Sequence, residues 1–416
     1  MLCYNKNIER IDFNNFWESF DGGNKMNDVY ERALEAHRNW KGKLSVESKA
    51  KIDSKEDLGL AYTPGVAEPC REIAKDRDLA YEYTWKGNSI AVISDGTAVL
   101  GLGDIGPEAA LPVMEGKSIL FKKFGGVNAV PIVLNTKNTE EIIQTIKNIA
   151  PTFGGINLED ISAPRCVEIE RRLIEELDIP VFHDDQHGTA IVVTAALINS
   201  LKLAEKEAKD VTVIVSGTGA AGSSIINMMK RLGVYNIYAF NRKGVLRRSE
   251  IAFYNFVEKE IAEITNIEDE DITMKDAMTK ADVFIGVSGP NVINAEMVRS
   301  MKSKPIVFAM ANPEPEIPYE EAIRGGAFVA GTGRSDFPNQ VNNVLAFPGL
   351  FKGALKARAK KITEEMKMAA AVGIANLISE DELNPEYVIP SVFDERVADF
   401  VAQEVIRVSE LENGRG

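Results

Sequence analysis

Cysteine is scarce in this sequence, and its spacing gives no sign of a crosslink or of a zinc site. The chain has 3 cysteines, Cys3, Cys70 and Cys166, and no two of them form a CxxC pair. An odd number of cysteines without metal-ligand spacing argues against a disulfide framework and against a zinc centre. Such usage is typical of proteins from a reducing cytosol, so we expect a cytoplasmic protein.

Long apolar runs and dense basic clusters are also missing. No apolar run approaches the roughly 18 residues of a membrane helix, and residues 1–25 lack both a signal-peptide core and a transit-peptide pattern. The formal net charge is −14, with no lysine- and arginine-rich run to follow a phosphate backbone. We therefore expect neither a membrane nor a nucleic acid as partner. A small anionic substrate would need a local cation or a metal, because the overall field repels it.

The sequence contains enough material for two lobes of the α/β class. A length of 416 residues fits two or three domains of roughly 100 to 200 residues each. From Ser89 onward, short β-branched runs alternate with helix-length segments, as in parallel sheets with crossover helices. We expect a substrate and metal domain followed by a Rossmann-type, doubly wound dinucleotide-binding domain. The predicted limits are a tail at 1–26, a catalytic domain at 27–203, a dinucleotide-binding domain at 204–352, and helices at 353–416 that pack back on the catalytic domain.

Most predicted strands of the first lobe lead into acidic residues. These strands are expected at Ser89–Ser94, Ala129–Leu134, Gly155–Leu158 and Pro180–Phe182. Three of them run into Asp95, Glu159–Asp160 and Asp184–Asp185. In open parallel sheets the ligand cleft lies at the carboxyl ends of the strands, so these acids are expected to converge.

The second lobe is expected to begin after a helix at Gly188–Leu203 and a charged connector at Ala204–Asp210. Its predicted strands are Val211–Ser216, Asn236–Phe240, Val283–Val287, Pro305–Ala309 and Ala327–Ala330. Beyond Pro348 the pattern turns helical, over Gly353–Ile378 and Asp394–Val408.

A glycine-rich turn follows the first strand of the second lobe. The residues are Gly217, Thr218, Gly219, Ala220, Ala221 and Gly222, and an apolar helix then runs to about Leu232. Gly217 permits a tight turn, Gly219 lets backbone approach a pyrophosphate, and Gly222 allows close helix packing. The helix N-terminus adds free N–H donors. A glycine turn alone is a weak signal, but a strand before it and a helix after it predict that NAD or NADP binds here.

The residue after the second strand of this lobe bears on the choice of cofactor. NAD-specific folds usually carry Asp or Glu there, whereas this chain has Asn241, followed by Arg242 and Lys243. Asn241 has no charge with which to repel a 2′-phosphate, and an arginine can grip phosphate with paired donors. We therefore expect NADP⁺ to be used at least as well as NAD⁺. The alternative is that both cations are solvated and serve only the turn before Gly244.

Several motifs resemble those of the small prokaryotic type of malic enzyme. The similar segments, in order, are LAYTPGVAEP, ISDGTAVLGLGDIGPEAALPVMEGK, GGINLEDI, VFHDDQHGTA, ANPEPEI and GRSDFPNQVNNVLAFPG. The resemblance covers residues 36–353. It implies oxidative decarboxylation of L-malate to pyruvate and CO₂, reduction of NAD(P)⁺, a divalent metal and a homodimer.

The resemblance also implies roles for single residues. Glu159, Asp160 and Asp185 would be the metal ligands, Lys117 the general base and Tyr62 the general acid. Three carboxylates without cysteine form a hard-oxygen site, which favours Mg²⁺ or Mn²⁺ over zinc. A lysine can serve as base where nearby positive charge and partial burial favour its neutral form.

Further residues are assigned to the site by the same resemblance. Asp184 would position Lys117, while Asn312, Asn342 and Asn343 resemble asparagines that contact malate and the nicotinamide ribose. For each asparagine the alternative is a simple turn residue.

Three details limit the match. The larger animal-type enzymes have an arginine eighteen residues before the base, where this chain has Val99, so the cation for the malate C4 carboxylate is not identified. The run Gly101–Gly106 is interpreted as a close backbone approach to substrate or nicotinamide, because no clear helix start follows it. His183 is not expected to be a metal ligand, because a residue that alternates along a strand end faces the opposite side from its neighbour.

Two other functions remain open. One is a dehydrogenase of the amino-acid type, in which a lysine is the base but no metal is required. The other is a non-catalytic metabolite-binding regulator on the same fold. Glu159, Asp160 and Asp185 argue against the first, and the presence of every expected catalytic residue argues against the second.

Overall fold

The computed structural model describes residues 23–99 and 101–414, and it divides into two compact units, 1–48 and 49–416. In the described part of the first unit the regular element is α2 (Gly23–Trp40). This helix begins inside the predicted tail 1–26. The rest of that tail, with Cys3, lies outside the described residues.

The first sheet has four parallel strands in the order β2-β1-β3-β4. The strands are β1 (Ser89–Ser94), β2 (Asn128–Val133), β3 (Gly155–Leu158) and β4 (Val181–His183). The helices between them are α6 (Pro107–Leu120), the π-helix η3 (Phe121–Gly125), α7 (Thr139–Ile149) and α8 (Arg165–Glu176), with a short turn η4 (Ala150–Thr152). Strands β1 and β3 are buried throughout, as expected for parallel strands covered on both faces.

The second sheet has six strands in the order β10-β9-β8-β5-β6-β7, all parallel except β7. The strands are β5 (Thr212–Ser216), β6 (Asn236–Asn241), β7 (Gly244–Val245), β8 (Val283–Gly286), β9 (Ile306–Ala309) and β10 (Val329–Thr332). The helices are α10 (Ala220–Leu232), η6 (Arg248–Phe253), α11 (Phe256–Ile264), α12 (Met274–Lys280), α13 (Ala295–Arg299) and α14 (Tyr319–Arg324). The order reverses beside β5, which is the switch point of a Rossmann-type sheet. The predicted α/β class is confirmed.

Helix α9 (Asp184–Ala204) joins the two sheets and lies in the core. It is long and apolar enough to pass a length and hydropathy test for a membrane span, yet 72% of that window is buried inside the protein. The helix packs against α10 and α16 (Glu364–Asn376). A buried core helix passes the same test as a membrane helix, so its composition follows from this position. The turn η5 (Ala208–Asp210) then leads into β5.

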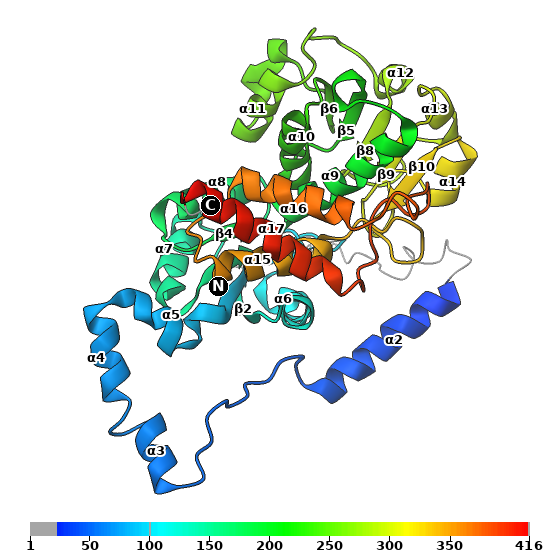
Figure 1. Cartoon of the computed structure of the whole chain (residues 1–416). Coiled ribbons are helices and arrows are strands. Elements are labelled where there is room, and N and C mark those ends of the chain that lie inside the picture. Colours follow the sequence, from blue (N-terminus) through cyan, green and yellow to red (C-terminus); the bar gives the residue numbers. More distant parts are fainter. Residues whose placement is uncertain (1–22, 100, 415–416) are drawn as a thin grey trace, which may run out of the picture. The chain divides into compact units, whose positions relative to one another are not determined.

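The last helices form a group that packs on the first lobe. Helix α17 (Arg396–Glu412) contacts both α15 (Phe347–Lys356) and α16, and α15 also contacts η3 (these three helices are orange to red in Figure 1). One apolar cluster runs through residues of both sheets and of these helices. The predicted domain limits remain a prediction, because the lobes share this core.

The segment 49–88 contributes no buried residue to the fold. It contains α3 (Lys55–Ala61), α4 (Ala67–Lys75), η1 (Arg77–Leu79), α5 (Ala80–Tyr83) and η2 (Trp85–Asn88). Several large apolar side chains are exposed on it, among them Leu58, Leu60 and Val66.

Three sequence expectations about these elements were wrong. A helix does follow the Gly101–Gly106 run, because α6 begins at Pro107; proline at the first helical position is a normal helix start. The helical pattern at Gly353–Ile378 is interrupted after Lys356, where Arg358 adopts a φ of +51°. Strand β7 was not expected, since two residues carry no periodic signal.

Candidate active site

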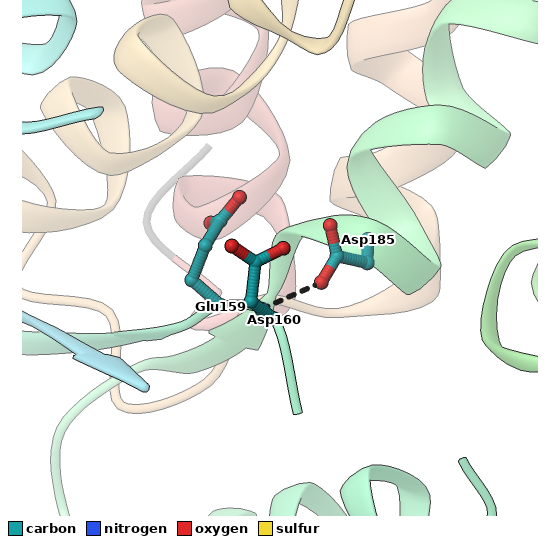
Figure 2. A group of neighbouring side chains, drawn as sticks. All are labelled: Glu159, Asp160 and Asp185. Carbon is teal, nitrogen blue, oxygen red and sulfur yellow. Dashed lines mark hydrogen bonds between the residues drawn. The ribbon is translucent and has the colours of Figure 1, made fainter. Parts of the chain in front are cut away.

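Three carboxylates meet at the carboxyl end of the first sheet. Glu159 and Asp160 follow β3, and Asp185 lies in the first turn of α9, directly after β4. Each offers an oxygen within 4.8 Å of the others (Figure 2). The Asp160 backbone N–H donates to Asp185 Oδ2 at 2.8 Å, the dashed line of Figure 2. The convergence expected from the strand order is therefore present.

This group of acids is electrostatically suited to a cation. Burial, together with the charge of Asp185, raises the pKa of Asp160 to about 8. Burial also raises the pKa of Glu159 well above its usual value, against the opposing effect of Lys117. The Asp160 Oδ2 atom is buried, and no residue that the structure describes forms a hydrogen bond with it. A divalent ion with a preference for oxygen ligands would satisfy this atom and balance the charges.

Lys117 reaches this group from α6. Its Nζ lies 2.9 Å from Glu159 Oε1 and 2.5 Å from Asp184 Oδ2, with 10% of the side chain exposed. It also lies over the ring of Phe347, 4.1 Å from the centroid. Burial alone would lower the pKa of Lys117, but Asp184 and Glu159 outweigh burial and raise it above its ordinary value.

Asp184 is fully buried and links Lys117 to a residue far along the chain. Its Oδ2 accepts from Asn343 Nδ2 at 3.0 Å, and Thr189 Oγ1 donates to Asn343 Oδ1 at 3.2 Å. Asn343 belongs to the turn η7 (Asn343–Leu345), which its neighbour Asn342 caps through the Val344 N–H. Asp184 therefore contacts Lys117 and Asn343, and it is not one of the three acids that converge.

Two further residues, Asp95 and His183, lie at this edge of the sheet. Asp95 does not join the acidic group, because it forms a buried ion pair with Arg165 at 2.7 Å. His183 Nε2 lies 3.5 Å from Asp185 Oδ2, but His183 is not one of the three residues whose oxygens converge. That it is not a metal ligand stays a prediction.

Tyr62 is not brought to this group within the chain. It ends α3, its side chain is 65% exposed, and its hydroxyl has no hydrogen-bond partner among the described residues.

The glycine turn after β5 has the shape of a phosphate cradle. Gly217 adopts a φ of +104°, and a Cβ at Gly222 would overlap the Gly217 carbonyl oxygen. A Cβ at Gly219 would meet nothing within 4 Å, so the turn is open on that side. Helix α10 begins at Ala220 without a side-chain cap, which leaves the N–H groups of Ala220 and Ala221 directed at the opening. The residues present fit a dinucleotide pyrophosphate.

Comparison with known proteins identifies the family. The family profile "Malic enzyme, N-terminal domain" matches residues 41–174, and "Malic enzyme, NAD binding domain" matches residues 186–410. The chain belongs to the malic enzyme family. It is 55% identical to the bifunctional malic/malolactic enzyme of Bacillus subtilis (strain 168), over 92% of this chain and 93% of that protein.

Other malic enzymes resemble the chain equally clearly. The NADP-dependent malic enzyme of Escherichia coli (strain K12) is 46% identical over 90% of this chain, which corresponds to 51% of that longer protein. The crystal structure of the NAD-dependent malic enzyme from Thermotoga maritima has a TM-score of 0.87 and 50% identity, covering 90% of this chain and 98% of that one. Membership in the malic enzyme family makes the chain an oxidoreductase that uses a nicotinamide dinucleotide.

In this malic enzyme fold, the asparagine of the second sheet lies beside a loop of the first lobe. Asn312 follows β9, and its Nδ2 donates to Met310 O at 3.3 Å. A Cβ at Gly101 would lie 3.1 Å from Pro313 Cδ, so the loop that precedes α6 touches the Asn312–Pro313 turn. Gly101 is thus a close-approach position, although its partner is protein.

Sequence reasoning missed several residues that support the site. Asn157 Nδ2 donates to Glu159 Oε2 at 2.9 Å, and buried Glu170 accepts from the His183 N–H at 2.7 Å. Glu258 hydrogen-bonds with Asn241 at the dinucleotide site. Asn157 alternates with apolar residues inside β3, and a buried polar residue in an apolar strand was the one local signal available.

Proposed function

We propose that the chain catalyses the divalent-metal-dependent oxidative decarboxylation of L-malate to pyruvate and CO₂, with reduction of NAD(P)⁺. One observation carries this proposal: three carboxylates converge, one of their buried oxygens has no hydrogen-bond partner among the described residues, and a buried lysine contacts one of the three. An amino-acid dehydrogenase that needs no metal would have no use for that group of acids.

Glu159, Asp160 and Asp185 would hold Mg²⁺ or Mn²⁺. The bound ion would supply Lewis-acid polarisation of the substrate hydroxyl and, after oxidation, of the ketone oxygen. By holding the ion, the three carboxylates would allow anionic malate, which they would otherwise repel, to bind beside Lys117.

Lys117 would take the C2 hydroxyl proton as hydride leaves for the nicotinamide. It can do so only as the neutral amine, whereas Asp184 and Glu159 now hold its pKa high. Coordination would divert the charge of Glu159 away from the lysine and lower that pKa. Asp184, held by Asn343, would keep the amine directed at the substrate. Its carboxylate would stabilise the ammonium group that forms when Lys117 takes the proton.

Tyr62 would protonate C3 of the enol formed by loss of CO₂. Because Tyr62 is exposed in the single chain, this role requires the homodimer that the resemblance implies. Asn312, Asn342 and Asn343 would contact malate and the nicotinamide ribose. From the sequence alone we expect NADP⁺ to be used at least as well as NAD⁺. The residues around Asn241 in the structure favour NAD⁺ instead. We retain the cytoplasm as the proposed location.

The test is absorbance at the reduced-nicotinamide band with L-malate, Mn²⁺, and NAD⁺ or NADP⁺ in parallel. A chelator should abolish reduction and added Mn²⁺ should restore it. Asp185→Ala should lose both turnover and metal dependence, whereas the exposed acid Asp178, changed to alanine, should leave both intact. Metal-stimulated oxidation in Asp185→Ala would overturn the ligand assignment, and chelator-resistant oxidation would favour the amino-acid type.

A further inference from the structure

A carboxylate from a distant element lies at the end of β6, where the sequence has only Asn241. Glu258, in the first turn of α11, accepts from Asn241 Nδ2 at 2.9 Å through Oε1. The same oxygen accepts from Thr218 Oγ1 at 3.2 Å. Thr218 is the second residue of the glycine turn, so one carboxylate oxygen bridges that turn and the end of the second strand.

The position is the one at which Rossmann-type folds recognise the adenosine ribose. In that fold the pyrophosphate lies on the glycine turn, and an acid at the end of the next strand accepts from the ribose hydroxyls. Here that strand is β6 and its last residue is Asn241. The side-chain amide of Asn241 binds Glu258, so the missing acid is supplied from α11.

Glu258 is held in this place on both sides. Its Oε2 accepts from the Asn255 N–H at 3.3 Å and from Asn255 Nδ2 at 2.9 Å, and Asn255 Oδ1 accepts from the Glu258 N–H in return. This capping box fixes the side chain at the helix start. The carboxylate is therefore preorganised and loses little freedom when a ribose binds.

The two neighbouring cations are not organised in the same way. Arg242 and Lys243 are exposed, and neither side chain has a hydrogen bond or ion pair with any residue that the structure describes. To bind a 2′-phosphate, each must order a long, solvated side chain, and such exposed pairs add little. The fixed carboxylate of Glu258 acts on the ribose at closer range, and no long side chain has to be ordered for it to do so.

We propose that Glu258 faces the adenosine ribose and gives the chain a preference for NAD(H) over NADP(H). This rests on the proposed function only in taking the second lobe as the nicotinamide dinucleotide site. A free ribose diol can donate to Glu258 Oε1 in place of Thr218 Oγ1, the longer of the two contacts at that oxygen, whereas a 2′-phosphate is repelled by the carboxylate. The preference reverses the expectation drawn from Asn241, Arg242 and Lys243 in the sequence.

The experiment measures binding rather than turnover. The full chain is titrated with NADH and, separately, with NADPH, and Kd is read from nicotinamide fluorescence without malate or metal. NADH should bind about 10- to 100-fold more tightly, the range expected for a hydrogen bond to a charged group. Glu258→Gln should remove most of this difference, since glutamine keeps the capping box without the charge. Glu263→Gln, an exposed change on the same helix, should leave the ratio of the two Kd values unchanged.

Each outcome decides the proposal. Equal Kd values in the parent would overturn it, as would an unchanged ratio in a folded Glu258→Gln protein. If that variant melts early, the parent's ratio still decides. A chain that prefers NADH but fails to oxidise malate supports the role of Glu258 and refutes the proposed function. A chain that oxidises malate but binds both cofactors equally does the reverse.

Discussion

Lys117 should be essential for the oxidation step. Lys117→Ala removes the group that takes the hydroxyl proton, and loss of a general base costs roughly 10² to 10⁴ in rate. The measurement is kcat for NAD(P)H formation from L-malate. The control is Lys123→Ala, since Lys123 is an exposed lysine close by in the chain and should keep parental turnover. Parental turnover in Lys117→Ala would mean that another group is the base.

Tyr62 should matter for protonation at C3. Tyr62→Phe removes the phenolic proton donor while keeping the ring, so pyruvate formation should fall by roughly 10² to 10⁴. Exchange of solvent tritium into pyruvate C3 should fall at least as far as oxidation does. The control is Tyr83→Phe, an exposed tyrosine of the same segment. Exchange at the parental rate in Tyr62→Phe would assign the acid to another group.

Site residues were predictable from the sequence where the order of parallel strands brings them together. Glu159, Asp160 and Asp185 follow parallel strands, so strand order alone brings them together. Asp95 also follows such a strand, but Arg165 neutralises it. Nothing at Asp95 itself indicates that partner.

Glu258 shows the same limit at the cofactor site. Its approach to Asn241 depends on how α11 packs beside the second sheet. The local pattern around Glu258 predicts a helix start and nothing about a ribose.

The strands other than β7 were predicted within two residues of their observed bounds. Strands β1 and β3 have the predicted bounds, since each is an apolar run that ends at an acid. Helix α9 was expected to begin at Gly188 and begins at Asp184. Charged residues before an apolar run give no periodic signal, yet acids are favourable in the first turn of a helix.

Glu170 connects three elements around the site and should make stability depend on pH. From α8 it accepts from the His183 N–H, from Gln186 Nε2 at 3.0 Å and from His187 Nε2 at 2.8 Å. Burial alone would raise the pKa of Glu170, but His187 and Lys367 outweigh burial and lower it to about 2. Because the pKa of Glu170 is lower in the folded state than its usual value of 4.5, the ionised carboxylate stabilises the folded protein at pH values above about 4.5. This contribution is lost as the pH falls toward 2.

Glu170→Gln should therefore destabilise the protein on the order of 3 kcal/mol at pH 7. The difference from the parent should shrink as pH falls below about 4.5. Urea unfolding followed by circular dichroism across this range measures it. Glu168→Gln, an exposed change on the same helix, should show no such trend. A pH-independent difference would mean that the ionised form of Glu170 is not what stabilises the fold.

At the scale of the whole molecule, both sheets were predictable, whereas the domain limits stay a prediction. The alternation of strands and helices predicts both sheets. The apolar cluster, however, runs from β1 through α9 to β5 and on to α17. Which helices cover which sheet depends on long-range packing, and apolar periodicity does not state the partner of an apolar face.

The exposure of the segment 49–88 predicts that two chains act together. None of its residues is buried, and Leu58, Leu60 and Tyr62 expose large apolar surfaces. Burying such surface against a second copy is favourable by about 25 cal/mol per Å², and two-fold dimers are the commonest assembly. We expect a homodimer in which Tyr62 of one chain serves Lys117 of the other.

Complementation between two inactive variants tests this arrangement. Tyr62→Phe and Lys117→Ala chains with different tags are co-expressed, and the mixed dimer is isolated through both tags. If sites are shared, one site of the mixed dimer carries both changes and the other carries neither, so about half of the parental activity per dimer should return. The control pairs Lys117→Ala with Asp185→Ala. Both residues lie in one chain's site, joined through Glu159, so that mixed dimer should stay inactive. An inactive Tyr62→Phe/Lys117→Ala dimer would show that Tyr62 does not act across the subunits.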